Sequence, residues 1–229
     1  MQNRYFGFWI LIFCFGWLLI FGLLSFPAEA MGSPVPRHYH KVELDIGIDD
    51  FDDGDFTANS SWWVFDNVSP EVTSIEGSSL ALHIKGKAQN NWYAGGMGVY
   101  LAKPNRNFSQ YRSLEMDIYG FGPGQGTLKI ELFDDDNGNW EIEQNTLEAN
   151  VLLYDDRFVK QITVDWVGWK HIVIPLADFQ DDNSGVGDDF WNVEQANQSG
   201  GLIQLQFICI ASKKDGSFHY LIDNIVFTR

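Results

Sequence analysis

The residues with the clearest chemical potential are carboxylates near the two ends of the chain. The stretch "IDDFDDGDF", residues 48–56, holds the densest group of acids. Far from it in sequence, Asp223 stands in "YLIDNIVF", residues 220–227, whose β-branched and aromatic residues indicate a strand. Strict alternation would put Asp223 on a face that is otherwise aliphatic and aromatic. A buried carboxylate costs several kcal/mol unless it is paired, so Asp223 needs a partner.

A calcium ion is one candidate partner for Asp223. The first and last strands of a β-sandwich commonly pair, which would bring Asp50, Asp52 or Asp53 close to Asp223. Two neighbouring carboxylates repel each other unless a cation lies between them. Calcium accepts carboxylate and carbonyl oxygens in irregular geometry, whereas zinc and copper favour His and Cys, which do not accompany these acids. Hydrogen bonds from backbone amides or an Arg are the alternative.

Two further acidic stretches do not fit a known calcium loop. They are "FDDDNGNW", residues 133–140, and "QDDNSGVGDD", residues 180–189. An EF-hand loop needs acids or Asn at its early odd positions, Gly at position six and Glu at position twelve. With Gly138 at position six, Phe133 takes position one and Gln144 position twelve. We therefore interpret the stretch at 180–189 as a solvated turn, and a solvated turn is also the alternative to a metal site at 133–140.

One strand resembles the catalytic strand of laminarinase-type β-glucanases. Glu115 and Asp117 in "EMDIYG" match its first two acids, but Tyr119 and Gly120 stand where the third acid belongs. A retaining glycosidase needs two carboxyl groups about 5 Å apart. Without the second catalytic acid the strand cannot supply this pair, and no other catalytic motif is present. The sequence therefore favours a protein that is not an enzyme, with a β-glucanase as the less favoured alternative.

Alternating apolar and polar residues predict an all-β domain. Besides 220–227, this period-two pattern occurs in segments 79–85, 113–119, 127–133, 170–176 and 202–210. Clusters of Gly, Asn, Asp and Ser separate the segments and indicate turns. The stretch 188–196 fits one or two helical turns at most, and no segment forms a convincing amphipathic helix. The pattern predicts a sandwich or barrel.

The N-terminal residues predict export. Residues 1–30 contain an apolar run that ends in "FPAEA", which is typical of a signal peptide; an uncleaved membrane anchor is the alternative. Residues 31–43 read as a linker and 44–229 as the folded domain. We expect a secreted, periplasmic or cell-surface location. Cys209 would be the one cysteine left after cleavage, and we expect it to be a buried hydrophobe.

Short motifs over most of the domain carry a family resemblance. "DDFDDG", "NWYAGGMGVYL", "VDWVGWKHIVIPLADFQ" and "YLIDNIVF" occur in the order and spacing of jelly-roll carbohydrate-binding modules. The chain resembles the family-eleven-like modules of the galactose-binding-type superfamily. This resemblance implies a two-sheet jelly roll with a structural calcium ion. The implied ligands are Asp52 (or Asp50 in its place), the backbone carbonyl of Gly77, and Asp223; the family more often has Glu where Asp52 stands.

Aromatic residues beside turns suggest sugar binding. Flat rings meet the apolar face of a sugar, and carboxylates, amides or Arg meet its hydroxyl rim. We expect stacking from Trp92, Tyr93, Tyr119 and Trp140, and hydroxyl contacts from Asp117, Glu131 and Arg157. The resemblance adds Tyr154, beside Arg157. Outward positions Asp117, Tyr119, Glu131, Gln204 and Gln206 would line one open sheet face.

The predicted partner is a neutral polysaccharide. A net charge of −16 disfavours nucleic acid, anionic lipid and acidic glycans. We therefore expect a monomeric, exported, non-catalytic module for neutral β-glucan-type chains. The alternative is an envelope structural or adhesion protein on the same fold.

Overall fold

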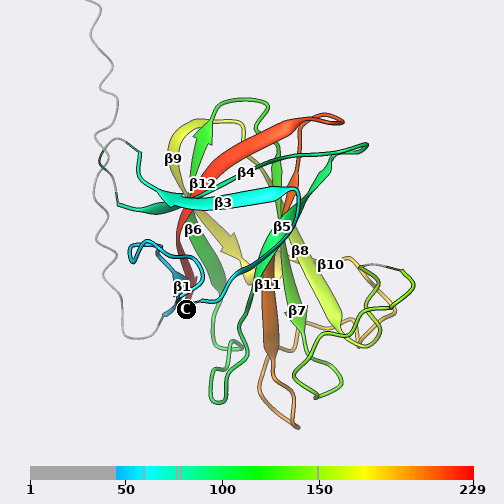
Figure 1. Cartoon of the computed structure of the whole chain (residues 1–229). Helices are drawn as coiled ribbons and strands as arrows, with labels where there is room; N and C mark the ends of the chain where they lie inside the picture. Colours follow the sequence, from blue (N-terminus) through cyan, green and yellow to red (C-terminus); the bar gives the residue numbers. More distant parts are fainter. Residues whose placement is uncertain (1–44, 59, 76, 78, 149) are drawn as a thin grey trace, which may run out of the picture. The chain divides into compact units, whose positions relative to one another are not determined.

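Two antiparallel six-stranded sheets form the domain (Figure 1). The computed structural model describes residues 45–229 except 59, 76, 78 and 149, so the predicted signal peptide and linker lie outside the described residues. Sheet A contains, in order, β3 (Val68–Thr73), β4 (Ala81–Lys87), β12 (Ser217–Thr228), β6 (Ser113–Phe121) and β9 (Val167–Pro175), and β1 (Ile46–Asp49) pairs with β12. Sheet B contains, in order, β10 (Gln180–Asp181), β8 (Asp156–Thr163), β7 (Thr127–Asp134), β11 (Leu202–Ile210), β5 (Tyr93–Tyr100) and β2 (Trp63–Asp66). The predicted all-β, two-sheet sandwich is confirmed.

The segments with a period-two pattern all form strands, because their apolar side chains alternate with polar ones and pack into one shared core. Leu82 and Ile84 of sheet A and Leu205 and Phe207 of sheet B are fully buried in the same cluster. Trp62 stacks on Phe207 with ring centroids 5.4 Å apart. Cys209 is buried and free, as predicted. The short edge strands β1, β2 and β3 and the glycine-rich β5 lack a clear alternation and were not predicted from it.

A β-bulge in β12 breaks the alternation predicted for residues 220–227. The pairing of β12 with β6 shifts register between Asp223 and Val226, and Asn224 has a positive φ of 52°. Tyr220 and Ile222 enter the core before the bulge; after it, the core position passes to Ile225. The strictly alternating prediction is therefore wrong, because one extra residue reverses the phase.

Helical structure is confined to one 3₁₀ turn in the described part of the chain, at Leu176–Asp178. The expected helical turns at 188–196 do not form. Instead, the backbone N–H of Asn192 donates to Asp134 Oδ2 at 2.9 Å, which ties this irregular segment to the end of β7. No helix among the described residues has the length and apolar character that a membrane span requires.

The core contact of Phe207 gives a direct test of the sandwich. We expect Phe207→Ala to lower the free energy of unfolding by about 3–5 kcal/mol, because it leaves a cavity under Trp62. The neighbouring Gln206 points out of the same strand, so Gln206→Ala should change stability by no more than about 0.5 kcal/mol. Urea unfolding followed by fluorescence measures both. Similar losses for the two variants would contradict the assigned faces.

Candidate functional site

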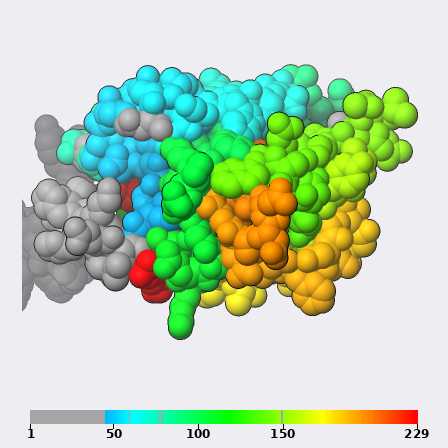
Figure 2. Space-filling model, turned by 90° about the horizontal axis from the view of Figure 1, so that it is seen from below, coloured from blue at the N-terminus to red at the C-terminus, as the bar shows by residue number. Residues whose placement is uncertain are grey.

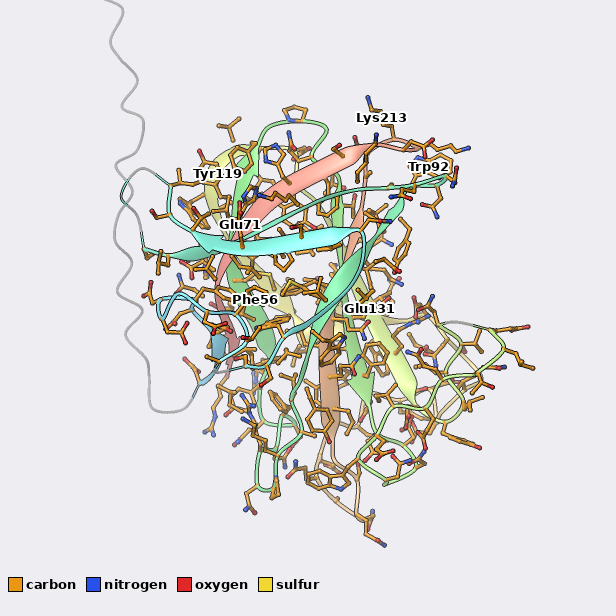
Figure 3. All side chains as sticks on the ribbon, viewed as in Figure 1. Phe56, Glu71, Trp92, Tyr119, Glu131 and Lys213 are labelled. Carbon is orange, nitrogen blue, oxygen red and sulfur yellow. The ribbon has the colours of Figure 1, made fainter. Side chains whose placement is uncertain are left out.

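The outward residues predicted for one face lie on two different sheets. Asp117 and Tyr119 belong to β6 of sheet A, whereas Glu131 belongs to β7 and Gln206 to β11 of sheet B. Figure 3 shows Tyr119 and Glu131 on these separate elements. The prediction of a single shared face is therefore wrong, because β6 and β7 are consecutive in sequence but cross from one sheet to the other.

The outward face of sheet B carries a cleft of about 450 Å³. Its lining consists of Asn91, Trp92, Tyr93, Lys129, Glu131, Asn150, Arg157, Ile208 and Ile210. Four residues predicted to contact a ligand are therefore brought together: Trp92, Tyr93, Glu131 and Arg157. They come from the start of β5 and the connection before it, from β7, and from β8.

One side of the cleft is a network of charged groups. Lys129 Nζ lies 2.8 Å from Glu131 Oε1 and 2.7 Å from Asp182 Oδ2. Arg157 Nε donates to Asp182 Oδ1 at 2.6 Å, and its Nη1 donates to the carbonyl of Asn150. Burial lowers the pKa of Lys129, but the two carboxylates outweigh burial and leave the pKa raised. The network therefore presents fixed, charged hydrogen-bonding groups.

The other side of the cleft is aromatic and aliphatic. Trp92 is 55% exposed, and Ile208 and Ile210 project from β11 beside it. The hydroxyl of Tyr93 donates to Asp66 Oδ2 at 2.6 Å, which fixes the ring. Burial, followed by this hydrogen bond, raises the pKa of Tyr93. The cleft thus combines an apolar wall with a polar rim.

Two aromatic rings on the same face were not among the predicted site residues. Trp63 and Phe65 of β2 lie over β5, where Gly98 and Gly96 leave room for them. A Cβ on Gly98 would approach Trp63 Cζ2 to 2.5 Å, and one on Gly96 would approach Phe65 Cζ to 2.6 Å. The signal in the sequence was the pair of glycines in "AGGMG" beside an aromatic edge strand.

The remaining predicted ligand residues lie outside this cleft. The indole N–H of Trp140 donates to the carbonyl of Gln198, and the Trp140 carbonyl accepts from the hydroxyl of Tyr100, both at 2.7 Å. Tyr154, 53% exposed, lies in the connection between β7 and β8. Asp117 is almost completely buried on sheet A.

On sheet A one imidazole joins the two acids of the glucanase-like strand. His171 Nδ1 lies 2.9 Å from Asp117 Oδ1, and its Nε2 lies 3.1 Å from Glu115 Oε2. Asp117 Oδ2 also accepts from the side chain of Asn224, the bulge residue. Both carboxylates are thus engaged by side chains of sheet A.

Asp223 lies where the sequence placed it, beside the first acidic segment. β1 pairs with β12, as predicted. Burial raises the pKa of Asp223 to about 7, and repulsion from Asp52 and Asp117 adds to this rise. Asn224 N donates to its Oδ1 at 2.8 Å and Ser79 Oγ to its Oδ2 at 3.3 Å. Asp223 therefore accepts a backbone hydrogen bond, as the alternative to calcium expected. The nearby charge of Asp52 still favours a cation.

The other two proposed calcium ligands are exposed. Asp50 Oδ1 accepts from the backbone N–H of Asp52 at 3.3 Å. Gly77 lies in the connection between β3 and β4 with a positive φ of 77°. Both stand in connections next to the strands that flank Asp223.

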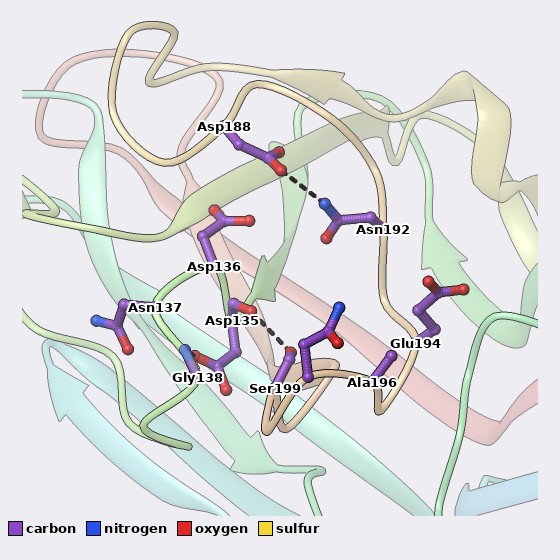
Figure 4. A pocket seen from close by; sticks show the side chains of 10 residues that line it. Asp135, Asp136, Asn137, Gly138, Asp188, Asn192, Glu194, Ala196 and Ser199 are labelled. Carbon is purple, nitrogen blue, oxygen red and sulfur yellow. Dashed lines mark hydrogen bonds between the residues drawn. The ribbon is translucent and has the colours of Figure 1, made fainter.

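A second acidic group lies at the ends of β7 and β8. Asp136, Asp156 and Asp188 each place a carboxylate oxygen within 4.8 Å of the others. Asp136 and Asp188 line a pocket of about 260 Å³ (Figure 4). Asp134 and Asp135 are buried, so residues 133–140 are not a solvated turn, whereas residues 180–189 are exposed or half-buried, as the interpretation of that stretch expected. Burial, followed by neighbouring carboxylates, raises the pKa of Asp156 to about 7.

The chain belongs to a known family of carbohydrate-binding domains. The profile of the family Carbohydrate binding domain 30 matches residues 52–229, most of the chain. No protein with a curated description matches the chain.

Solved structures share the jelly-roll fold. The family 11 carbohydrate-binding module of a cellulosomal cellulase of Clostridium thermocellum is 15% identical, with a TM-score of 0.54; the match covers 80% of this chain and 94% of that one. A family 11 module from Clostridium thermocellum in complex with a β-1,3-1,4-mixed-linked tetrasaccharide is 16% identical, with a TM-score of 0.53 and coverage of 80% and 96%. The predicted resemblance to jelly-roll carbohydrate-binding modules is confirmed.

The position of Trp63 depends on Gly98, which gives a test of the aromatic face. We expect Gly98→Ala to displace the Trp63 ring, because the added Cβ overlaps it. The indole N–H signal of Trp63, assigned with a Trp63→Phe variant, should move in the NMR spectrum. Gly47→Ala is the matched control, since a Cβ at Gly47 meets nothing within 4 Å. An unchanged Trp63 signal in Gly98→Ala would contradict this packing.

Proposed function

We propose that the domain binds a neutral β-glucan-type polysaccharide in the cleft of sheet B, without cleaving it. The observation that carries this proposal is the cleft itself, where the exposed ring of Trp92 faces a rim built from Lys129, Glu131 and Arg157. Membership of the Carbohydrate binding domain 30 family supports a sugar as the ligand.

The two walls of the cleft suit the two surfaces of a hexose. The ring C–H face is apolar and gains by covering Trp92 and the nearby isoleucines. The hydroxyls then meet the polar rim, where they exchange water for fixed charged donors and acceptors. Trp63, Phe65 and Gln206 lie further along the same outward face and extend the surface for a chain of several sugars.

The charge of the protein favours a neutral chain. With a net charge of −16, the protein repels acidic polysaccharides. The family 11 module that holds a mixed-linked tetrasaccharide shares the fold, so a β-1,3-1,4-glucan is the first ligand to test. We infer that the module acts as an exported monomer, outside the cell or at its surface.

Removal of one aromatic from each sheet tests where the sugar binds. Trp92→Ala should weaken binding to mixed-linked β-glucan by about tenfold or more, as expected for an exposed aromatic anchor. Tyr119→Ala removes an aromatic from sheet A and should leave the affinity unchanged, because Tyr119 packs against Phe121 and Trp169. Affinity electrophoresis and calorimetry measure the binding of each variant.

Three outcomes would contradict parts of this proposal. A loss for Tyr119→Ala with none for Trp92→Ala would move the site to sheet A. Silence of the wild type towards every neutral glycan would favour the envelope structural or adhesion protein. Release of reducing ends from β-glucan, abolished by Glu115→Gln, would show a glucanase.

We also propose a structural calcium ion beside Asp223. The buried carboxylate and the charge of Asp52 fit such an ion, and the exposed Asp50 and the carbonyl of Gly77 are further oxygen ligands in the adjoining connections. The ion would neutralise repulsion at the point where β1, β12 and the β3–β4 connection meet. Bound there, the ion would stabilise the folded state. It would contact none of the residues that line the cleft of sheet B.

Calcium should raise the melting temperature of the chelator-treated chain. An ion at about a hundred times its dissociation constant adds about 2.7 kcal/mol of stability when it binds the folded state alone. Asp223→Asn should show a smaller rise than the wild type, because it removes the buried negative ligand. The exposed Asp165→Asn should retain the full wild-type rise. Equal rises in wild type and Asp223→Asn would remove this calcium site.

A further inference from the structure

Two long connections meet beside the acidic pocket. One joins β7 to β8, and the other joins β10 to β11. Figure 2 shows these connections, light green and gold to orange, against each other on one face. The contact is hydrogen-bonded: Asp135 N donates to the carbonyl of Gly201 at 3.1 Å, and Ser199 Oγ donates to the carbonyl of Asp135 at 2.7 Å. The acidic pocket is thus formed by both connections.

Asp156 is a buried carboxylate that lacks hydrogen-bond donors. Its side chain is 0% exposed, and neither of its oxygens has a hydrogen-bond partner among the described residues. One of its oxygens lies within 4.8 Å of a carboxylate oxygen of Asp136 and of one of Asp188. Asp134, Asp136 and Asp155 each leave one further buried oxygen unpaired. Unpaired buried carboxylates are costly, so this concentration of them favours the binding of a compensating cation.

The basic side chains on this side of the domain are engaged elsewhere. Arg157 follows Asp156 directly, but its guanidinium bonds to Asp182 and to the carbonyl of Asn150. Lys129 bonds to Glu131 and Asp182. The described salt bridges therefore leave the three converging aspartates without a cationic side chain.

Gly187 brings the backbone of the β10–β11 connection against these carboxylates. It has a positive φ of 78°, and a Cβ at this position would overlap Asp156 Oδ1 and Asp136 Oδ2. The chain therefore passes directly over the two oxygens, which places Asp188 opposite Asp136 (Figure 4). Asn192 Nδ2 donates to Asp188 Oδ2 at 2.7 Å and orients that carboxylate.

We propose that Asp136, Asp156 and Asp188 bind a divalent cation, calcium being the ion that fits, and that this ion fastens the β10–β11 connection to the ends of β7 and β8. All three ligands are hard oxygens, which calcium prefers, and the group includes no His or Cys. Calcium tolerates the irregular geometry of loop carboxylates and takes its remaining ligands from backbone carbonyls or water. The site is separate from the one proposed at Asp223.

Calcium titration of the chelator-treated full chain tests this site. Isothermal titration calorimetry should show that Asp156→Asn binds one calcium ion fewer than the wild type, whatever the Asp223 segment binds. The variant keeps the shape of the side chain and removes one charge from a repelling group, so we expect it to fold. Equal numbers of bound ions with equal affinities in the two proteins would overturn the proposal.

A charge-matched control separates this site from general acidity. Glu194 is exposed and lines the same pocket, and Glu194→Gln should bind as many ions as the wild type. An equal loss in Glu194→Gln and Asp156→Asn would overturn the assignment of the three aspartates.

A measurement on the wild type alone covers the case in which Asp156→Asn fails to fold. In ¹H–¹⁵N spectra of the wild type, calcium should shift the backbone amides of residues 136, 156 and 187–188. Unchanged positions at saturating calcium would overturn the site, because an ion bound there lies against these amides.

Discussion

The packing of two sheets across one apolar core is the constraint on which the rest of the structure depends. Alternate side chains of both sheets enter this core, so the remaining positions face outward. Cys209 is free, so burial of apolar surface holds the described sheets together. Binding surfaces are thereby restricted to the outward faces and to the ends of strands, and each candidate site lies in one of these places.

Both acidic groups occur where regular strand pairing stops. Asp223 lies at the bulge where β12 changes partners, from β4 before it to β1 after it. Asp134 and Asp156 face each other at the last paired position of β7 and β8. Backbone groups leave the ladder at such points, and polar side chains close to the core replace water around them. The carboxylates are thus buried as a consequence of topology, and burial raises the pKa of Asp134, Asp156 and Asp223.

The core of the fold could be predicted from alternation, because burial of one face leaves a direct mark on the sequence. The bulge at Asn224 could not, since a single positive φ reverses the phase without any change in composition. The alternation pattern also does not show to which sheet a strand belongs. Asp117 and Tyr119 were therefore predicted on the wrong face. Trp63 was not predicted as a site residue, because the space that its ring occupies exists only where Gly98 has no side chain. The burial of Asp156 depends on a loop that is distant in sequence, and the periodicity of a strand does not show such long-range contacts.

The two outward faces differ in how far their own side chains satisfy one another. On sheet A, Tyr119 packs edge-on against Trp169 at 5.4 Å, and Phe121 stacks on His219 at 4.2 Å. On sheet B, Trp92 is 55% exposed and makes no ring contact with another described aromatic, beside a cleft that the β5 and β11 side chains leave open.

An aromatic ring with its faces already in contact gains little from a ligand, whereas an exposed ring gains the full burial of its surface. The rim of the cleft follows the same reasoning. Asp182 already holds Lys129 and Arg157 in place, so a ligand that bound these donors would not have to pay for their conformational entropy, which was lost on folding. Sheet B therefore presents fixed polar groups and an exposed aromatic ring, whereas the aromatic rings on the outer face of sheet A already contact one another.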